Sequence, residues 1–272
     1  EKETVTIDGK VYDKNTTFSI DGSSGKIYLG EIKTVSPDLT SGYFGRLMAW
    51  VDENRALKVR TNADTPRDTK QALDFGAEGI GLFRIEHMFY GENSEKPLAI
   101  LRKMILSGST EERKKWLNEW LPYIKVAVKG TMQVMNGKPV TFRLIDPPLH
   151  EFVPHTQENV EALAKELGIA AEELNKRIVA LEEVNPMMGL RGVRLGITYP
   201  EITETQFRAL FEAEAELRKE GFDPHLEIMV PLTISVTELK HQKAICDRVH
   251  AEVEAAMGAK IEGHALGLGR SL

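Results

Sequence analysis

Hydrophobic positions change their spacing along the chain, and the two spacings predict alternating strands and helices. Short apolar runs that end in arginine, proline or a polar turn predict strands at residues 56–60, 79–84, 140–145 and 225–230. Elsewhere apolar residues recur every three or four positions, which predicts amphipathic helices. These are expected near residues 43–53, 66–75, 97–106, 109–124, 157–184, 203–220 and 235–257.

Local motifs mark where several of these helices begin and end. Ser109 and Ser235 are each followed three residues later by glutamate, which predicts capping boxes. Residues 203–206 are expected to cap a further helix that Gly221 would stop. Pro66 suits the first turn of its helix because proline fixes a helical φ there.

The order of the predicted elements indicates the fold class. Strands that alternate with helices favour a parallel sheet flanked by helices. The first strand lacks the glycine fingerprint of dinucleotide-binding sheets, so a (β/α) barrel is favoured. A barrel closes with eight strands, and only about four are predicted here. We therefore expect an α/β fold that forms a partial (β/α)8 TIM-type barrel of about four parallel strands, preceded by a short β-rich segment.

The two ends of the chain depart from this pattern. Residues 1–32 contain short alternating runs that stop at Asp-Gly or Gly-Lys, which predicts an antiparallel meander too small to bury a core alone. Residues 259–272 are rich in glycine and aperiodic, so we expect a loose tail that need not belong to the natural gene. The barrel segment is then expected over residues 33–258.

Composition narrows the classes of function. The net charge of −6, from 35 Lys and Arg against 41 Asp and Glu, argues against a nucleic-acid-binding surface. No apolar run approaches the ~20 residues of a membrane-spanning helix, so no membrane partner is expected. Cys246 is the single cysteine, which excludes an internal disulfide. With no signal-peptide character at residues 1–3, we expect a cytoplasmic location.

Arginine follows an apolar residue at or near the end of three predicted strands, at Arg60, Arg84 and Arg143. Ligands of parallel α/β folds bind at the carboxyl ends of the strands, so these three side chains are expected at one mouth. A guanidinium group binds phosphate or carboxylate through two parallel hydrogen bonds. The pattern therefore predicts a pocket for a small, multiply charged anion.

Each arginine also has a structural alternative, an ion pair with a nearby acid such as Asp64, Glu86 or Asp146. For one arginine alone the ion pair is the better interpretation, whereas three at equivalent strand ends favour the anion pocket. Arg191 lies in a glycine-containing loop over residues 185–194. A fourth arginine of the pocket and a solvated charge at a turn are equally good interpretations of it.

Other candidates for chemistry are weaker. His150 and Glu151 follow a stiff Pro-Pro turn, and packing or solvation explains them better than acid–base catalysis. His87 has no partner at metal-ligand spacing. Cys246 lies on an amphipathic helix and is expected to be a structural thiol.

Five longer segments carry a further signal, at residues 59–66, 76–89, 143–156, 185–192 and 227–232. They include Gly-Ile-Gly-Leu-Phe-Arg-Ile-Glu-His at 79–87 and Asp-Pro-Pro-Leu-His-Glu-Phe at 146–152. Together they resemble the pyruvate phosphate dikinase family, in register from about residue 5 to residue 258.

The resemblance implies a phosphotransferase. That family interconverts ATP, phosphate and pyruvate with AMP, pyrophosphate and phosphoenolpyruvate, and a histidine on a swivelling domain carries the phosphoryl group. The family's arginines that match Arg84 and Arg143 hold the transferring phosphoryl group at the barrel mouth, and Arg60 and Arg191 match further arginines of that site. Residues 1–32 would then be the end of the swivelling domain.

The departures from the family also lead to expectations. The ATP-binding domain is absent, and none of the seven histidines stands in the phosphohistidine motif. The ligands of the full enzyme's Mg2+ and its proton-donating cysteine would lie beyond residue 258, and Ile85 stands where many members carry threonine. We therefore expect no catalytic residue and no metal ligand in this chain, which should be inactive alone. Its expected partners are phosphoenolpyruvate or pyruvate, the swivelling domain and further copies of itself.

Two alternatives stay open. The first enzyme of the sugar phosphotransferase system uses phosphoenolpyruvate in the same kind of barrel, although the Asp-Pro-Pro-Leu-His-Glu-Phe run speaks against it. The second is a non-catalytic anion-binding or interaction module, because half a barrel leaves an open sheet edge that invites a second copy.

Overall fold

The computed structural model describes residues 3–35, 38, 41–90, 94–154, 156–261 and 265–269. Contacts within the chain divide it into two compact units, Glu1–Ala56 and Leu57–Leu272. Each unit is described by itself.

The first unit contains two β-hairpins and one helix. They are β1 (Thr4–Ile7) with β2 (Lys10–Asp13), β3 (Phe18–Asp21) with β4 (Lys26–Leu29), and α1 (Gly42–Asn54). Asp8 and Gly9 turn the first hairpin with positive φ angles of 49° and 76°, a backbone that Asp-Gly pairs favour. The antiparallel strands are therefore present as predicted, but as two separate two-stranded sheets and not as one meander.

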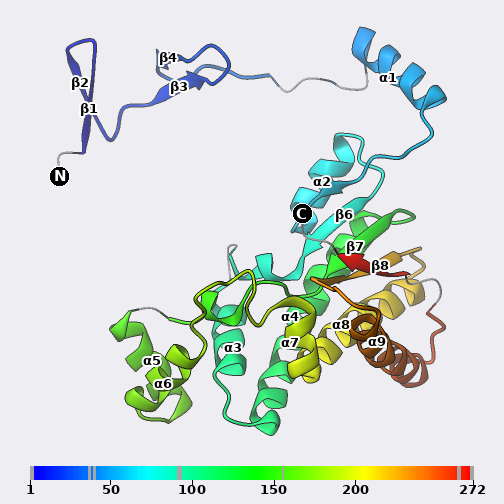
Figure 1. The fold of residues 1–272 in the computed structure, drawn as a ribbon. Coiled ribbons are helices and arrows are strands. Elements are labelled where there is room, and N and C mark those ends of the chain that lie inside the picture. Colours follow the sequence, from blue (N-terminus) through cyan, green and yellow to red (C-terminus); the bar gives the residue numbers. More distant parts are fainter. Residues whose placement is uncertain are drawn as a thin grey trace. The chain divides into compact units, whose positions relative to one another are not determined.

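The second unit is built on a five-stranded parallel sheet whose spatial order equals its chain order (Figure 1). Its strands are β5 (Thr61–Asn62), β6 (Ile80–Arg84), β7 (Pro139–Arg143), β8 (His225–Pro231) and β9 (Ala265–Gly269). Parallel neighbours in chain order, each joined by a helical crossover, are the topology of a (β/α) barrel. The predicted α/β class and partial barrel are confirmed.

Helices connect these strands. The α-helices are α2 (Pro66–Asp74), α3 (Glu95–Ile105), α4 (Thr110–Val134), α5 (Gln157–Leu167), α6 (Ala171–Ala180), α7 (Gly192–Thr198), α8 (Pro200–Lys219) and α9 (Val236–Met257). Two 3-10 turns, η1 (Ile85–Phe89) and η2 (Leu149–Glu151), follow β6 and β7. Over the described ranges, no helix combines the length and the apolar character needed to cross a membrane.

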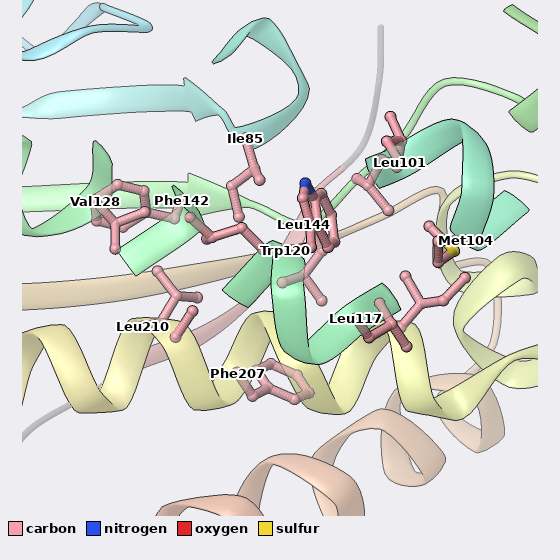
Figure 2. Packing of buried hydrophobic residues seen from close by; sticks show 14 of the residues in the cluster. Ile85, Leu101, Met104, Leu117, Trp120, Val128, Phe142, Leu144, Phe207 and Leu210 are labelled. Atoms are coloured by element: carbon pink, nitrogen blue, oxygen red, sulfur yellow. The ribbon is translucent and has the colours of Figure 1, made fainter. Parts of the chain in front are cut away.

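One face of the sheet is covered by α4 and α8. Val140 and Phe142 of β7 are fully buried on this face, and the Phe142 ring lies 4.9 Å from that of Phe83 on β6. Figure 2 labels Phe142 together with Val128 and Trp120 of α4 among the residues of this buried cluster. Each large side chain buried in this way contributes about 1.5–3 kcal/mol. Because side chains alternate along a strand, the residues that alternate with Val140 and Phe142 in β7 point to the other face of the sheet.

Some predicted boundaries are wrong. The first strand is β5 at Thr61–Asn62, and residues 57–60 before it form no strand. Helix α8 begins at Pro200, where proline supplies the first turn, and not at residues 203–206. Ser235 forms the full capping box of α9. Ser109 caps α4, but Glu112 accepts its hydrogen bond from the Gly108 N–H instead of from Ser109.

The predicted loose tail is also wrong in its middle part. Residues 265–269 form β9, which pairs with β8 from Glu227 opposite Ala265 to Pro231 opposite Gly269. Glycine weakens a strand, but a neighbouring strand with unpaired N–H and C=O groups can still recruit it. Residues 262–264 and 270–272 of that tail lie outside the described residues.

Glu214 of α8 is a fully buried carboxylate. Its Oε1 accepts hydrogen bonds from Arg218 Nε at 3.0 Å and Nη2 at 2.9 Å, while Oε2 has no partner in the described part of the chain. Burial raises the pKa of Glu214 to about 7, although the Arg218 charge opposes the shift. The protonated form is therefore favoured in the folded state well above the pH at which glutamate normally ionises.

We expect Glu214→Gln to remove a pH dependence of stability. A raised folded pKa contributes stability that is complete below about pH 4.5 and is lost as pH rises through about 7. Urea unfolding should show the wild type losing about 3 kcal/mol relative to Glu214→Gln between pH 4.5 and pH 8. Parallel stability curves for the two proteins would contradict the assignment.

Candidate functional site

Two of the predicted arginines lie side by side at the end of the sheet. Phe83 of β6 is in register with Phe142 of β7, and Arg84 is in register with Arg143. The phenylalanines point into the helix-covered core, so the arginines that follow them point to the opposite face. The pleat thus places two guanidinium groups at the carboxyl ends of neighbouring parallel strands, where such folds bind ligands.

Arg84 is held by Asp64, from the turn after β5. Asp64 Oδ2 accepts from Arg84 Nη1 at 2.8 Å, and Oδ1 accepts from the Arg84 backbone N–H at 2.9 Å. His87 Nδ1 lies 2.8 Å from the same Oδ2. Within the described ranges the Arg84 guanidinium uses only this one nitrogen, so its other N–H donors remain for a ligand.

Arg143 lies between two acids. Its Nη2 pairs with Glu86, which is 1% exposed, and its Nη1 lies 3.0 Å from Asp146 Oδ2. Burial raises the pKa of the Glu86 carboxyl, with the charge of Arg143 opposing the shift. Arg143 Nε, Glu86 Oε2 and Asp146 Oδ1 are buried without a hydrogen-bond partner among the described residues. Such a cluster is rare in a purely structural core, because unpaired polar groups are costly there.

Asp146 joins Arg191 to the same group. Its Oδ2 also accepts from Arg191 Nη2 at 3.1 Å, and its backbone oxygen accepts from Arg191 Nε at 3.1 Å. The segment predicted as a loop over residues 185–194 becomes helix α7 from Gly192 onwards. Gly192 has φ +55°, and a Cβ there would lie 2.9 Å from the Pro231 carbonyl oxygen at the end of β8. Glycine therefore lets the Arg191 segment approach the sheet closely.

Arg60 lies on the same face but deeper in the sheet. Its Nη2 donates to Glu227 Oε1 of β8 at 3.0 Å, and Thr141 of β7 is in register with Glu227. Thr141 precedes Arg143 by two residues, so this layer is roughly 7 Å below the strand-end arginines. The hydrogen bond from Arg60 lowers the pKa of Glu227. The structure thus brings together Arg84, Arg143 and Arg191 and places Arg60 beneath them.

The ion pairs given as the alternative for Arg60, Arg84 and Arg143 are present, and Arg191 is paired as well instead of being a solvated charge at a turn. Each arginine pairs with at least one acid, and the partners are Asp64 for Arg84, Glu86 and Asp146 for Arg143, Asp146 for Arg191, and Glu227 for Arg60. Four arginines and four acids leave no formal net charge. The pairs do not use all the guanidinium donors, because each group carries five N–H bonds. Anion binding by the arginines therefore stays a prediction.

Glu227, the partner of Arg60, is not among the candidate residues predicted from the sequence. The signal was one charged residue between Leu226 and Ile228, both buried on the helix-covered face. A charge at that alternate position marks the inward face of a partial barrel.

Metal-binding groups, Cys246 and His150 are the remaining candidates. Within the described residues no group of three or more His, Cys, Asp and Glu side chains could hold a metal ion. Cys246 is fully buried on α9, and burial raises the pKa of its thiol to about 12. It is a structural thiol, as predicted. His150 lies in η2, where its Nδ1 is buried without a partner in the described part of the chain.

Comparisons with known proteins add an independent line of evidence. The profile of the family described as "PEP-utilising enzyme, PEP-binding domain" matches residues 39–268. The pyruvate, phosphate dikinase of Clostridium symbiosum is 46% identical over 265 residues, which are 97% of this chain and 30% of that protein. The enzyme of the same name from Entamoeba histolytica is 48% identical over 252 residues, 90% of this chain and 28% of that protein.

A plant relative agrees. Pyruvate, phosphate dikinase 1, chloroplastic, of Oryza sativa subsp. japonica is 43% identical over 265 residues, 97% of this chain and 28% of that protein. The chain thus spans about 30% of the length of the curated relatives it matches.

We expect Asp146→Ala to destabilise the fold strongly. Asp146 is 2% exposed and neutralises Arg143 and Arg191 together, so its removal leaves two largely buried charges short of a partner. Breaking a buried ion pair from one side costs about 3 kcal/mol or more. Urea denaturation followed by circular dichroism measures the loss.

Asp247→Ala is the matched control, because Asp247 pairs with Lys243 on the exposed surface of α9. This variant should leave the free energy of unfolding nearly unchanged. Equal losses in the two variants would mean that Asp146 is not the shared partner of the two arginines.

Proposed function

This chain belongs to the PEP-utilising enzymes, as their PEP-binding domain, and from that premise we propose that it binds phosphoenolpyruvate or pyruvate in a pyruvate, phosphate dikinase. The observation that carries the proposal is the grouping of Arg84 and Arg143 at adjacent strand ends, with Arg191 tied to Arg143 through Asp146. The names of the relatives support the substrate class.

The chemistry of phosphoenolpyruvate suits this group. The ligand carries a phosphate and a carboxylate, and each accepts paired hydrogen bonds from a planar guanidinium. Arg84 and Arg143 would contact the phosphoryl oxygens, while Arg191 and, from the layer below, Arg60 would support that charge. The free donors of Arg84 make it the first contact, since Arg143 is held between two carboxylates.

Phosphoryl transfer depends mostly on positioning and on stabilising charge in the transition state. Arginines that acids already hold in place need little reorganisation when charge develops on the phosphoryl oxygens. In this proposal Asp64, Glu86 and Asp146 are positioning residues: they fix the guanidinium groups and leave the reacting atoms to the ligand and to the rest of the enzyme.

The remainder of the reaction belongs to the whole enzyme. It would interconvert ATP, phosphate and pyruvate with AMP, pyrophosphate and phosphoenolpyruvate, with a phosphohistidine on a swivelling domain as carrier. Mg2+ would neutralise substrate charge in that enzyme. The acids described at this mouth are taken up by arginines and do not fit a metal, so no step of the proposal runs through it. The swivelling domain and further copies of the chain are the proposed partners.

We expect phosphoenolpyruvate to bind saturably to this chain in calorimetry at low salt, and Arg84→Ala to weaken binding by about 10- to 100-fold. A hydrogen bond to a charged group contributes about 1.5–3 kcal/mol, which corresponds to that range. Titrations with and without Mg2+ would show whether these residues need the metal for binding.

Arg248→Ala is the control, because it removes the same charge from the exposed surface of α9, where Arg248 pairs with Glu204 and Glu252. It should retain wild-type affinity. A folded wild type that does not bind phosphoenolpyruvate would refute the proposal for this chain. Equal losses of affinity in the two variants would mean that positive charge in general, and not the Arg84 donors, attracts the ligand.

A further inference from the structure

A carboxylate clamp precedes Arg191 in the chain. Glu183 lies just after α6, and its Oε1 accepts a hydrogen bond from the Leu190 backbone N–H at 2.6 Å. The contact closes residues 183–190 into a loop whose last residue is the immediate neighbour of Arg191. Glu183 thus holds the backbone immediately before Arg191.

The clamp requires glycine at position 189. A Cβ added to Gly189 would lie 1.2 Å from Glu183 Oε2 and 2.0 Å from its Cδ. The carboxylate therefore occupies the space that any other side chain would fill. Here glycine is needed for close approach and not for an unusual backbone angle.

Other polar contacts close the loop from within. Asn185 Oδ1 accepts from the Met187 N–H at 3.1 Å, and the Met188 N–H donates to the Asn185 carbonyl oxygen at 3.0 Å. Arg194 Nη2, from α7, donates to the Met187 carbonyl oxygen at 3.2 Å. These bonds hold the turn from both sides of Arg191.

Hydrophobic burial contributes little to this loop. Met187 and Met188 are 73% and 72% exposed, and Val184 is fully exposed. Polar contacts must therefore determine its conformation. Glu183 Oε2 and Arg194 Nε are nonetheless buried without a partner in the described part of the chain. Buried polar atoms without partners are a departure from good packing that is concentrated at functional sites.

We propose that Glu183 is a positioning residue for Arg191, an inference that rests on the proposed function. By holding the Leu190 amide, Glu183 sets where the Arg191 guanidinium meets Asp146 and, with it, the phosphoenolpyruvate-binding group of Arg84 and Arg143. Glu183 acts through the backbone and does not touch the ligand. Small displacements of a positioned group cost large factors in binding and rate.

The first test measures the hydrogen bond between Glu183 and the Leu190 amide in the absence of any ligand. Hydrogen exchange of the Leu190 amide should be at least about tenfold faster in Glu183→Ala than in wild type, because the amide loses its acceptor. Glu183→Gln should stay near wild type, since its side-chain oxygen can still accept. Gly189→Ala should match Glu183→Ala, because the new Cβ displaces the carboxylate. Exposed Glu182, next in the chain, provides the control variant Glu182→Ala.

The second test measures phosphoenolpyruvate affinity by calorimetry. We expect about a tenfold loss in Glu183→Ala and in Gly189→Ala, recovery in Glu183→Gln and no change in Glu182→Ala. The double variant Glu183→Ala/Gly189→Ala should lose no more than either single variant, because both remove one contact. Unfolding midpoints close to wild type would exclude a general loss of structure.

Failures of the two proposals are distinguishable. Unchanged Leu190 exchange in Glu183→Ala overturns the clamp itself. Faster exchange with unchanged affinity overturns the positioning role and leaves the proposed function intact. A wild type that binds no phosphoenolpyruvate, while its Leu190 amide is protected, overturns the proposed function and the positioning role with it, and retains Glu183 as a structural clamp only.

Discussion

A guanidinium group on the inner face of a partial barrel needs a carboxylate partner, and most of the site follows from that constraint. Arg84, Arg143 and Arg191 are partly buried, so each charge requires compensation inside the protein. The chain meets the need with acids from neighbouring turns, and Asp146 serves two arginines together. The arginines and acids form a network of alternating charges that is neutral overall and holds each guanidinium group in one orientation. The guanidinium N–H donors that the network leaves unused are available for an anion.

The strand-end arginines could be predicted from sequence because the relevant rule is short-ranged. Arg84 and Arg143 each follow a phenylalanine, and alternation along a strand sends the two residues of each pair to opposite faces. The same rule led us to expect Arg60 at the mouth as well, whereas the structure places it below the other arginines. It precedes a strand of only two residues, so its level depends on tertiary contacts with Glu227 and with the small residues Gly79 and Gly81.

The same distinction explains which parts of the fold could be predicted. Helix starts at Pro66 and Ser235 depend on residues at most three positions away, and the structure contains both. Strand β9 depends on a free edge of β8 more than thirty residues earlier in the chain, so its glycine-rich sequence resembles a tail when considered alone. Ile85, which the resemblance predicts to stand where many family members carry threonine, is fully buried and is labelled in the hydrophobic cluster of Figure 2.

The neutrality of this network of arginines and acids also affects how such a site would select its ligand. A site with excess positive charge would attract any anion, whereas arginines that already have partners favour a ligand whose oxygens fit the unused donors. That selection depends on geometry, and geometry depends on how firmly each arginine is held. The Asp64 carboxylate accepts from both the backbone N–H and the guanidinium of Arg84. The Arg191 guanidinium donates to both the backbone oxygen and the carboxylate of Asp146. If the proposed function holds, specificity at this mouth would therefore depend on the acids and the backbone that fix the arginines, as much as on the arginines.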